Sequence, residues 1–221
     1  MSARQSRFVC PMNQLQVVEW WSDAKKHLKR DEHLGPFVKE FAKEGLRCKG
    51  DLFYTICRSI VGQQISVAAA DTIWGRLETA AKRIQPKAVL KLDEPQLRAI
   101  GLSRMKASYL LGIADAMSEF RKIDWDDLDD EAAISRLVEL RGVGRWTAEM
   151  VLIFTFARQD ILPLGDIGLI RAAEKNLYKR KPRDLQASQK RLEKMARQWR
   201  PYRTAATWYL WRTIDPVTVE Y

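Results

Sequence analysis

The spacing of apolar residues predicts α-helices along almost the whole chain. From Asn13 to Lys29, and again from Asp51 to about Ile65, apolar residues recur near every third or fourth position, as on one helix face. The same reasoning predicts further helical segments at Phe37–Lys43, Ser66 to about Lys82, a short piece from Pro86, another from Glu94, Ser103 to about Phe120, Ala132–Leu140, Trp146–Phe156, Asp166 to about Lys179, Asp184–Gln198 and Tyr202–Ile214. We find no strand-like alternation and no internal repeat, so the predicted fold class is all-α, with about ten helices joined by short loops.

Local signals refine these segments. Asp51 and Ser66 can each cap a helix by accepting a hydrogen bond from a free N–H of its first turn, and Ser103 begins another helix. The helix after Asp51 is predicted to bury Phe53, Ile56, Ile60 and Val61. The helix after Ser103 is predicted to have four apolar residues in register, which are Met105, Tyr109, Leu110 and Ile113.

Length and composition exclude several classes of protein. A chain of 221 residues with 46% hydrophobic residues can bury a sizeable core and is not disordered. Three cysteines exclude a disulfide scaffold, and two histidines disfavour a histidine metal site or a Ser-His triad. The apolar run Met150–Ala157 is too short to cross a membrane, and the N-terminus has no apolar stretch of signal-peptide length. These features predict a soluble, intracellular protein.

The net charge of +10 indicates an anionic partner. From Lys179 to Tyr221 there are eleven Lys/Arg against four Asp/Glu, and a second basic cluster lies between Lys25 and Arg30. Charged runs are also ordinary solvated surfaces, so composition alone leaves both interpretations open. The acidic block between Asp124 and Glu131 lacks the spacing of a calcium loop, and we interpret it as the loop before a helix.

Leu140–Ala148 is the most informative stretch, because Gly142 and Gly144 flank a single residue between two predicted helices. Glycines allow close backbone approach, and amides at a helix start can bind a phosphate oxygen. An ordinary tight turn between helices would have the same pattern.

This stretch resembles the helix-hairpin-helix of base-excision DNA glycosylases, L-P-G-V-G-x-x-T-A, with Arg141 in the usual proline position. Three further blocks are similar to the alkylation-repair branch, the 3-methyladenine DNA glycosylase II type, and follow in the same order: Ile60–Ser66, Leu97–Ala107 and Trp199–Trp211. The resemblance implies two helical subdomains with the active-site cleft between them and no N-terminal β-domain. One would span 52–158 and include the hairpin; the other would combine 1–51 with 159–221.

The resemblance also implies roles for individual residues. Asp166 matches the catalytic carboxylate; a plain helix cap is the alternative, and the two roles are compatible. Trp146, Met150 and Trp211 match positions of the base pocket, with core packing as the alternative. The expected DNA contacts are Gln63, Gln64, Gly142, Val143, Gly144, Arg145 and Lys106. Gln64 matches the residue that fills the vacated base stack, while Gln63 could instead tie helices together.

The implied activity is hydrolytic release of alkylated purines from damaged double-stranded DNA. Members that also cut the strand carry a lysine where Trp146 stands, so a monofunctional enzyme without lyase activity is expected. The alternatives are a glycosylase for deaminated or other lesions, such as hypoxanthine, and a non-catalytic damage-binding module.

No cofactor is expected to be required. Cys10, Cys48 and Cys57 lie too far apart for an iron–sulfur cluster and are expected to be buried or idle thiols. By resemblance, a structural Na⁺ or K⁺ would bind the hairpin through the backbone carbonyls of Val138, Leu140 and Val143. The expected state is a monomer with no membrane partner, located in the cytoplasm or nucleoid of a bacterium or the nucleus of a eukaryote.

Overall fold

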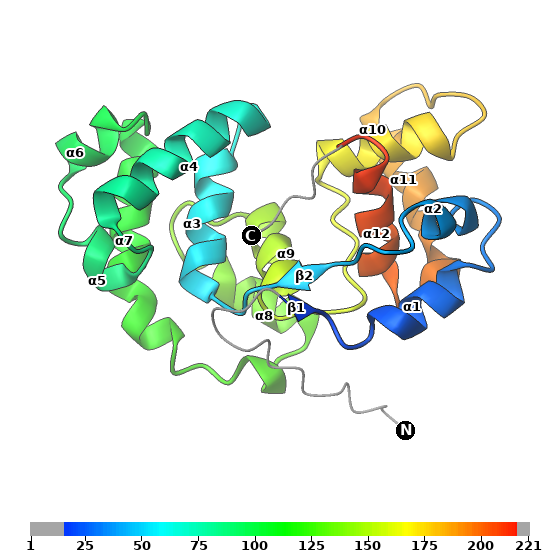
Figure 1. Cartoon of the computed structure of the whole chain (residues 1–221), viewed down its shortest axis with the longest axis horizontal. Helices are drawn as coiled ribbons and strands as arrows, with labels where there is room; N and C mark the ends of the chain where they lie inside the picture. Colours follow the sequence, from blue (N-terminus) through cyan, green and yellow to red (C-terminus); the bar gives the residue numbers. More distant parts are fainter. Residues whose placement is uncertain (1–15, 216–221) are drawn as a thin grey trace. The chain divides into compact units, whose positions relative to one another are not determined.

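The computed structural model describes residues 16–215 and is predominantly helical (Figure 1), which confirms the all-α class. The α-helices are α1 (Trp21–Leu28), α2 (Gly35–Glu40), α3 (Leu52–Gly62), α4 (Val67–Ala81), α5 (Pro86–Val89), α6 (Glu94–Ala99), α7 (Arg104–Phe120), α8 (Asp130–Leu137), α9 (Arg145–Phe154), α10 (Ile167–Asn176), α11 (Leu185–Met195) and α12 (Arg203–Arg212). Two 3₁₀ helices, η1 (Trp125–Asp127) and η2 (Ala196–Trp199), and two short strands, β1 (Gln16–Val17) and β2 (Arg47–Cys48), complete the described elements.

Two compact units make up the described chain. Unit 1 combines residues 16–50 with 152–215, and unit 2 is the continuous stretch 51–151. The boundary between residues 151 and 152 lies inside α9. The predicted subdomain limits and the cleft between the subdomains remain predictions.

In unit 2, α3 packs against α4 and α7, and α7 also contacts α5 and α6. The predicted inner face of α3 is confirmed, since Phe53, Ile56, Ile60 and Val61 are all buried. The predicted caps Asp51 and Ser66 are confirmed, since their side-chain oxygens accept hydrogen bonds from the backbone N–H groups of Tyr54 and Ala69. Ser103, predicted to begin a helix, also caps it by accepting from the N–H of Lys106. Good caps fix where these helices begin and therefore which face each one buries.

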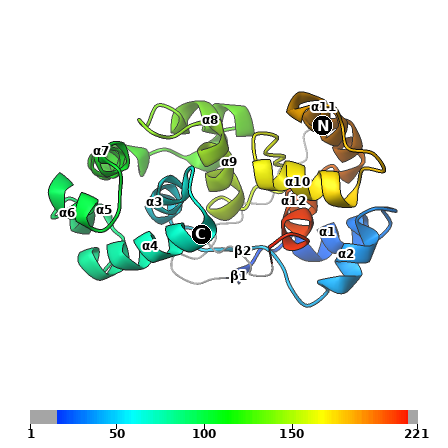
Figure 2. The same cartoon turned by 90° about the horizontal axis from the view of Figure 1, so that it is seen from above.

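Unit 1 is built around α12, which contacts α1, α2, α10 and η2 (Figures 1 and 2). Every residue from Thr204 to Leu210 is buried. The ring of Trp21 lies edge-on to Trp208 and stacks on Tyr209, with centroid separations of 5.0 and 5.5 Å. A helix buried on all sides is the centre of a core.

The prediction that no strand is present was wrong for the first described residues. β1 and β2 pair antiparallel, with Gln16 opposite Cys48 and Val17 opposite Arg47. The helix predicted from Asn13 therefore begins only at Trp21. Strands of two residues are too short to show an alternating pattern, and their pairing partner lies about thirty residues away in the sequence.

Two smaller expectations also need correction. Met105 is 64% exposed rather than part of the inner face of α7, whereas Leu110 and Ile113 are buried as predicted. Cys48 is disulfide-bonded and so is not an idle thiol; Cys57 is a free, buried thiol, and Cys10 lies outside the described residues.

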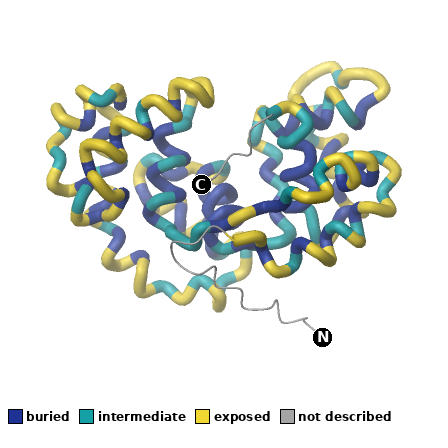
Figure 3. The backbone as a smooth tube through the Cα atoms, in the orientation of Figure 1, coloured by how far each residue is buried: buried dark blue, intermediate teal, exposed yellow. Residues whose placement is uncertain are grey.

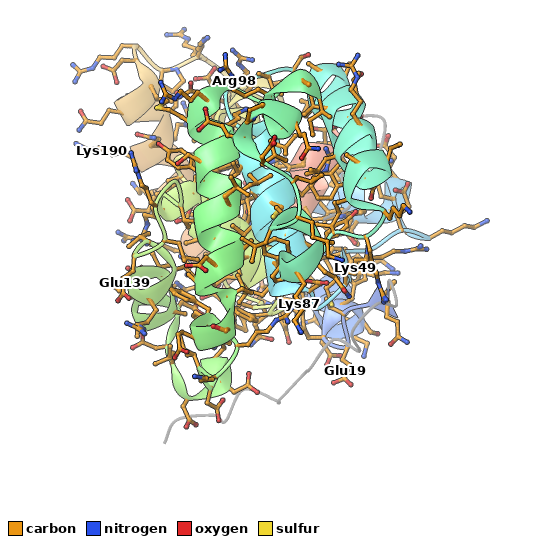
Figure 4. All side chains as sticks on the ribbon, turned by 90° about the vertical axis from the view of Figure 1, so that its left-hand side faces the viewer. Glu19, Lys49, Lys87, Arg98, Glu139 and Lys190 are labelled. Carbon is orange, nitrogen blue, oxygen red and sulfur yellow. The ribbon has the colours of Figure 1, made fainter. Side chains whose placement is uncertain are left out.

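Charged side chains cover the outer faces of the helices. Buried and exposed stretches alternate along the chain (Figure 3). Lys87, Arg98 and Glu139, labelled in Figure 4, are all exposed. The acidic block forms η1 and the start of α8, where Asp129 accepts a hydrogen bond from the N–H of Ala132 over 2.8 Å, as interpreted from the sequence. Within residues 16–215, no helix has both the length and the apolarity to span a membrane.

Candidate active site and helix-hairpin-helix

Asp166 lies at the start of α10, in unit 1. Its Oδ1 atom accepts a hydrogen bond from the backbone N–H of Leu169 over 2.5 Å, and its own N–H donates to the carbonyl of Pro163 over 2.9 Å. The capping role weighed from the sequence is confirmed. The carboxylate therefore lies at the positive end of the helix dipole, and the cap fixes its direction.

A second donor reaches the same carboxylate oxygen. The indole Nε1 of Trp211, on α12, donates to Asp166 Oδ1 over 3.1 Å. The ring of Trp211 stacks on Phe154 with centroids 6.0 Å apart and planes inclined by 11°. The structure thus brings together two residues that the sequence singled out separately. Phe154 was not predicted, because one aromatic residue in an apolar helix has no signal that separates it from the core.

The hairpin between α8 and α9 belongs to unit 2. Gly142 has a φ of +95°, and a Cβ atom there would lie 2.4 Å from the ring of Tyr109. The N–H of Val143 donates to the carbonyl of Leu140 over 2.9 Å and closes the turn. Gly142 is thus required both by its left-handed backbone and by the contact with Tyr109. Gly144, by contrast, is exposed and has no atom within 4 Å of its Cβ direction.

Arg141, which replaces the usual proline, packs on the same ring. Its guanidinium lies 5.9 Å from the centroid of Tyr109. A cation–π contact of this kind holds the turn against α7. It therefore replaces part of the rigidity that a proline would supply. Tyr109 is therefore a hairpin-supporting residue, and the sequence pattern had indicated only that it lies on a helix face.

The two glutamines after α3 have different environments. Gln63 Nε2 donates to the carbonyl of Gly142 and to the hydroxyl of Thr147, both over 3.1 Å. These bonds favour the interpretation in which Gln63 ties helices together. Gln64 is exposed and has a φ of +59°, a conformation that costs energy for any residue other than glycine. Its role in filling the base stack remains a prediction.

Lys106 points into the protein rather than away from it. Its Nζ donates to the carbonyls of Val61 and Gln63 over 2.8 and 2.7 Å. A cation at this place satisfies carbonyls at the end of α3 and complements the helix dipole. Burial lowers the pKa of the Lys106 ammonium. A phosphate would have to compete with these two carbonyls.

Arg145, at the start of α9, is held by two carboxylates. Its Nη2 and Nη1 donate to the two oxygens of Glu131 over 2.5 and 2.9 Å, and its Nε donates to Glu149 over 3.1 Å. The hydrogen bonds with Arg145 lower the pKa of Glu131, and the same bonds raise the pKa of Arg145. The predicted phosphate contact of Arg145 is untested, and both carboxylates were missed by the sequence patterns.

The remaining predicted residues lie just after α8 and in α9. Trp146 is half-buried and Met150 is buried, both in unit 2, so their predicted pocket with Trp211 remains a prediction. The carbonyl of Leu140 accepts the turn-closing bond from Val143, and Val138 is exposed. Among the residues from 16 to 215, no cluster of three or more His, Cys, Asp or Glu side chains is arranged to hold a metal ion. A monovalent cation on carbonyls would leave no such cluster.

Known proteins are similar to this chain in sequence and fold. The DNA-3-methyladenine glycosylase 1 of Schizosaccharomyces pombe is 33% identical over 171 residues, which cover 75% of this chain and 73% of that protein. A DNA-3-methyladenine glycosidase from Bacillus halodurans superposes with a TM-score of 0.69 at 28% identity, covering 90% of this chain and 92% of that chain. The 3-methyladenine DNA glycosylase of S. pombe in complex with abasic DNA gives 0.71 at 28% identity, covering 86% and 96%.

The family comparison covers three of the four blocks identified from the sequence and the first residues of the fourth. Residues 57–201 match the HhH-GPD superfamily of base excision DNA repair proteins, a range that includes Ile60–Ser66, the hairpin and Asp166. With this match and a relative one-third identical over three-quarters of its length, the chain belongs to the HhH-GPD superfamily.

Proposed function

We propose that this protein is a DNA glycosylase that excises alkylated purines of the 3-methyladenine and 7-methylguanine type in base-excision repair. The names of its relatives support this substrate class. The observation that carries the proposal is the carboxylate of Asp166, which receives the N–H groups of Leu169 and Trp211 on one oxygen. A carboxylate held in this way is suited to stabilise a developing positive charge.

The chemistry follows from the state of the substrate. A purine methylated at N3 or N7 carries a positive charge, so breaking its bond to C1′ of the sugar sends the electron pair to the base and neutralises it. The base therefore needs no general acid. The sugar becomes an oxocarbenium-like cation, and water adds its oxygen to C1′ and loses a proton. Asp166 would stabilise the cation and accept or direct that proton.

Recognition would require the base to leave the duplex. Exposed Gln64 would enter the vacated stack. Trp146 and Trp211 would hold the cationic base by stacking and cation–π attraction, and Met150 would pack against it. The amides of Gly142, Val143 and Gly144 would approach a phosphate, with the cation on the hairpin carbonyls as a bridge. Damaged double-stranded DNA is therefore the proposed partner.

The proposal includes an intact product strand. Strand cleavage by related enzymes needs an amine that forms a Schiff base with the sugar, and Trp146 offers none at the matching position. We further propose that the protein acts as a monomer, requires no cofactor for the reaction and works wherever the chromosomal DNA lies, in a nucleoid or a nucleus.

The experiment compares base release by the unchanged protein, by Asp166→Asn and by Asp184→Asn. Asp184 is a matched control, because it also caps a helix of unit 1, accepting from the N–H of Ala187 over 2.8 Å. Asparagine caps helices as well as aspartate does, so neither variant should lose its fold. DNA methylated by a simple alkylating agent is the substrate, undamaged DNA is the control, and chromatography identifies the released bases.

We expect the unchanged protein and Asp184→Asn to release 3-methyladenine or 7-methylguanine without strand scission. Asp166→Asn should be slower by about 100-fold or more while still binding DNA. Near-normal release by Asp166→Asn would remove Asp166 from the mechanism. Damage-dependent binding without any release would favour the binding module, and release only from hypoxanthine, uracil or oxidised-guanine duplexes would favour another lesion.

A further inference from the structure

One carboxylate oxygen of Asp166 accepts hydrogen bonds from two different helices. Oδ1 of Asp166 receives one hydrogen bond from α10, through Leu169, and one from α12, through Trp211. The first bond is local and would form at any capped helix. The second bond joins residues 45 positions apart and depends on how α12 packs against α10.

Gly168 leaves the space that this arrangement needs. A Cβ atom at position 168 would lie 3.1 Å from Asp166 Oδ1, 3.9 Å from Ile214 Cδ1 and 4.0 Å from Trp211 Cδ1. The φ of Gly168 is not in the left-handed region, so the backbone would accept any residue. Glycine is therefore favoured at position 168 because a side chain would not fit there, and not because of its backbone conformation.

The indole of Trp211 is itself fixed. Its ring is half-buried and stacks on Phe154 with an interplanar angle of 11°. A stacked ring cannot turn its N–H away from the carboxylate without losing that contact. A hydrogen bond to an ionised group is stronger than one between neutral groups, so the bond also holds the plane of the carboxylate.

We infer that Trp211 and Gly168 are positioning residues for Asp166. Trp211 aims the carboxylate through its indole N–H, and Gly168 keeps the contact open. The inference rests on the proposed function for its catalytic consequence, but the hydrogen bond itself can be tested without any activity. It gives Trp211 a role beyond the wall of a base pocket.

The structural test uses NMR of protein labelled with ¹⁵N at tryptophan. The indole resonance of Trp211 is assigned by its absence in Trp211→Phe. We expect this resonance to shift in Asp166→Asn and in Gly168→Ala and to stay in place in Asp184→Asn and Gly165→Ala. Gly165 is the matched glycine, since nothing lies within 4 Å of its Cβ direction. An unmoved resonance in Asp166→Asn would overturn the inference, whatever the enzyme does.

The kinetic test is a single-turnover assay with two substrates, DNA containing 3-methyladenine and DNA containing 7-methylguanine. Trp211→Phe keeps an aromatic ring and removes the donor. If Trp211 positions Asp166, the rate constant for both bases should fall by the same factor, about 10-fold, with unchanged affinity for DNA. Gly168→Ala should also slow both, and Gly165→Ala neither. Full activity in Trp211→Phe, or a changed preference between the bases, would overturn the positioning role. An inactive unchanged protein with a correctly shifting resonance would instead refute only the proposed function.

Discussion

Gln63 donates its side-chain amide to the carbonyl of Gly142 over 3.1 Å, across 79 positions of sequence. The bond connects the end of α3 to the turn of the hairpin within unit 2. The same nitrogen also donates to the hydroxyl of Thr147, which is 1% exposed. The hairpin is therefore held by a side chain for which the family resemblance left two roles open, a DNA contact and a tie between helices.

Replacing Gln63 should cost stability, whereas replacing its neighbour should not. Gln63→Met keeps the length of the side chain and removes both donors, so we expect a loss of about 1–2 kcal/mol. Gln64→Met is the control, because Gln64 is exposed, and it should stay within about 0.5 kcal/mol of the unchanged protein. Urea unfolding measures both. Equal losses in the two variants would contradict the hydrogen-bonded tie.

The two hairpin glycines should respond differently to alanine. In Gly142→Ala the left-handed backbone alone costs about 1–2 kcal/mol, and the Cβ atom would also strike the ring of Tyr109. Gly144→Ala meets neither obstacle and should be nearly neutral. Thermal unfolding compares the variants directly. A tolerated alanine at position 142 would show that the turn can relax without Tyr109.

The pair formed by Arg203 and Asp160 should be sensitive to the shape of the cation. Arg203 Nε and Nη2 donate to the two carboxylate oxygens over 2.7 and 3.0 Å, and both side chains are mostly buried. Arg203→Lys keeps the charge but loses the planar pair of N–H donors, so we expect the free energy of unfolding to fall by about 1.5–3 kcal/mol. Arg200 contacts the same carboxylate from the surface, and Arg200→Lys should change stability by less than about 0.5 kcal/mol. Denaturant unfolding of both variants separates the effect of the bidentate geometry from that of the charge. Similar losses of stability in the two variants would mean that the bidentate geometry is unimportant.

The ion pair of Glu131 with Arg145 should give a pH-dependent contribution to stability. Hydrogen bonding to Arg145 lowers the pKa of Glu131 in the folded state. The contribution is therefore present above the usual glutamate pKa, about 4.3, and is lost as the pH falls through the lower folded value. Glu131 is exposed, so Glu131→Gln should cost only about 0.5 kcal/mol at pH 7. Unfolding curves of the two proteins should converge as the pH falls, and a constant difference would contradict this origin.

The same variant tests whether Arg145 binds phosphate. Glu131→Gln removes the carboxylate that competes for the guanidinium of Arg145, so DNA affinity should rise. The slope of log affinity against log salt concentration should become steeper by about the value of one phosphate contact. Arg145→Gln should do the opposite. Binding titrations between low and moderate salt measure the slope. An unchanged slope in both variants would remove Arg145 from the predicted DNA contacts.

Local signals predicted the parts of the fold that depend on local chemistry. Asp51, Ser66 and Ser103 begin helices because their side chains cap the next turn, and this can be read from a few residues. The pairing of β1 with β2 could not be predicted in this way, because it joins short segments about thirty residues apart.

The candidate site also has features that follow from neighbouring residues and features that depend on tertiary packing. The place of Asp166 at a helix start follows from its neighbours, but the hydrogen bond from Trp211 exists only through the packing of α12. Lys106 shows the limit of reasoning from charge. Both a phosphate and the carbonyls of a helix end attract a cation, and here the carbonyls of Val61 and Gln63 are the partners that the fold supplies.

The division of unit 1 between two distant segments has a consequence for synthesis on the ribosome. Unit 2 is continuous and can fold once residue 151 has emerged, as domains generally do during translation. Residues 16–50 must wait much longer, because Trp21 packs against Trp208 and Tyr209 of α12. Until α12 has been synthesised, residues 16–50 expose an apolar surface that the residues next to them in the sequence cannot cover. Chaperone dependence during synthesis should therefore concentrate in residues 16–50, which lie outside the range that matches the family.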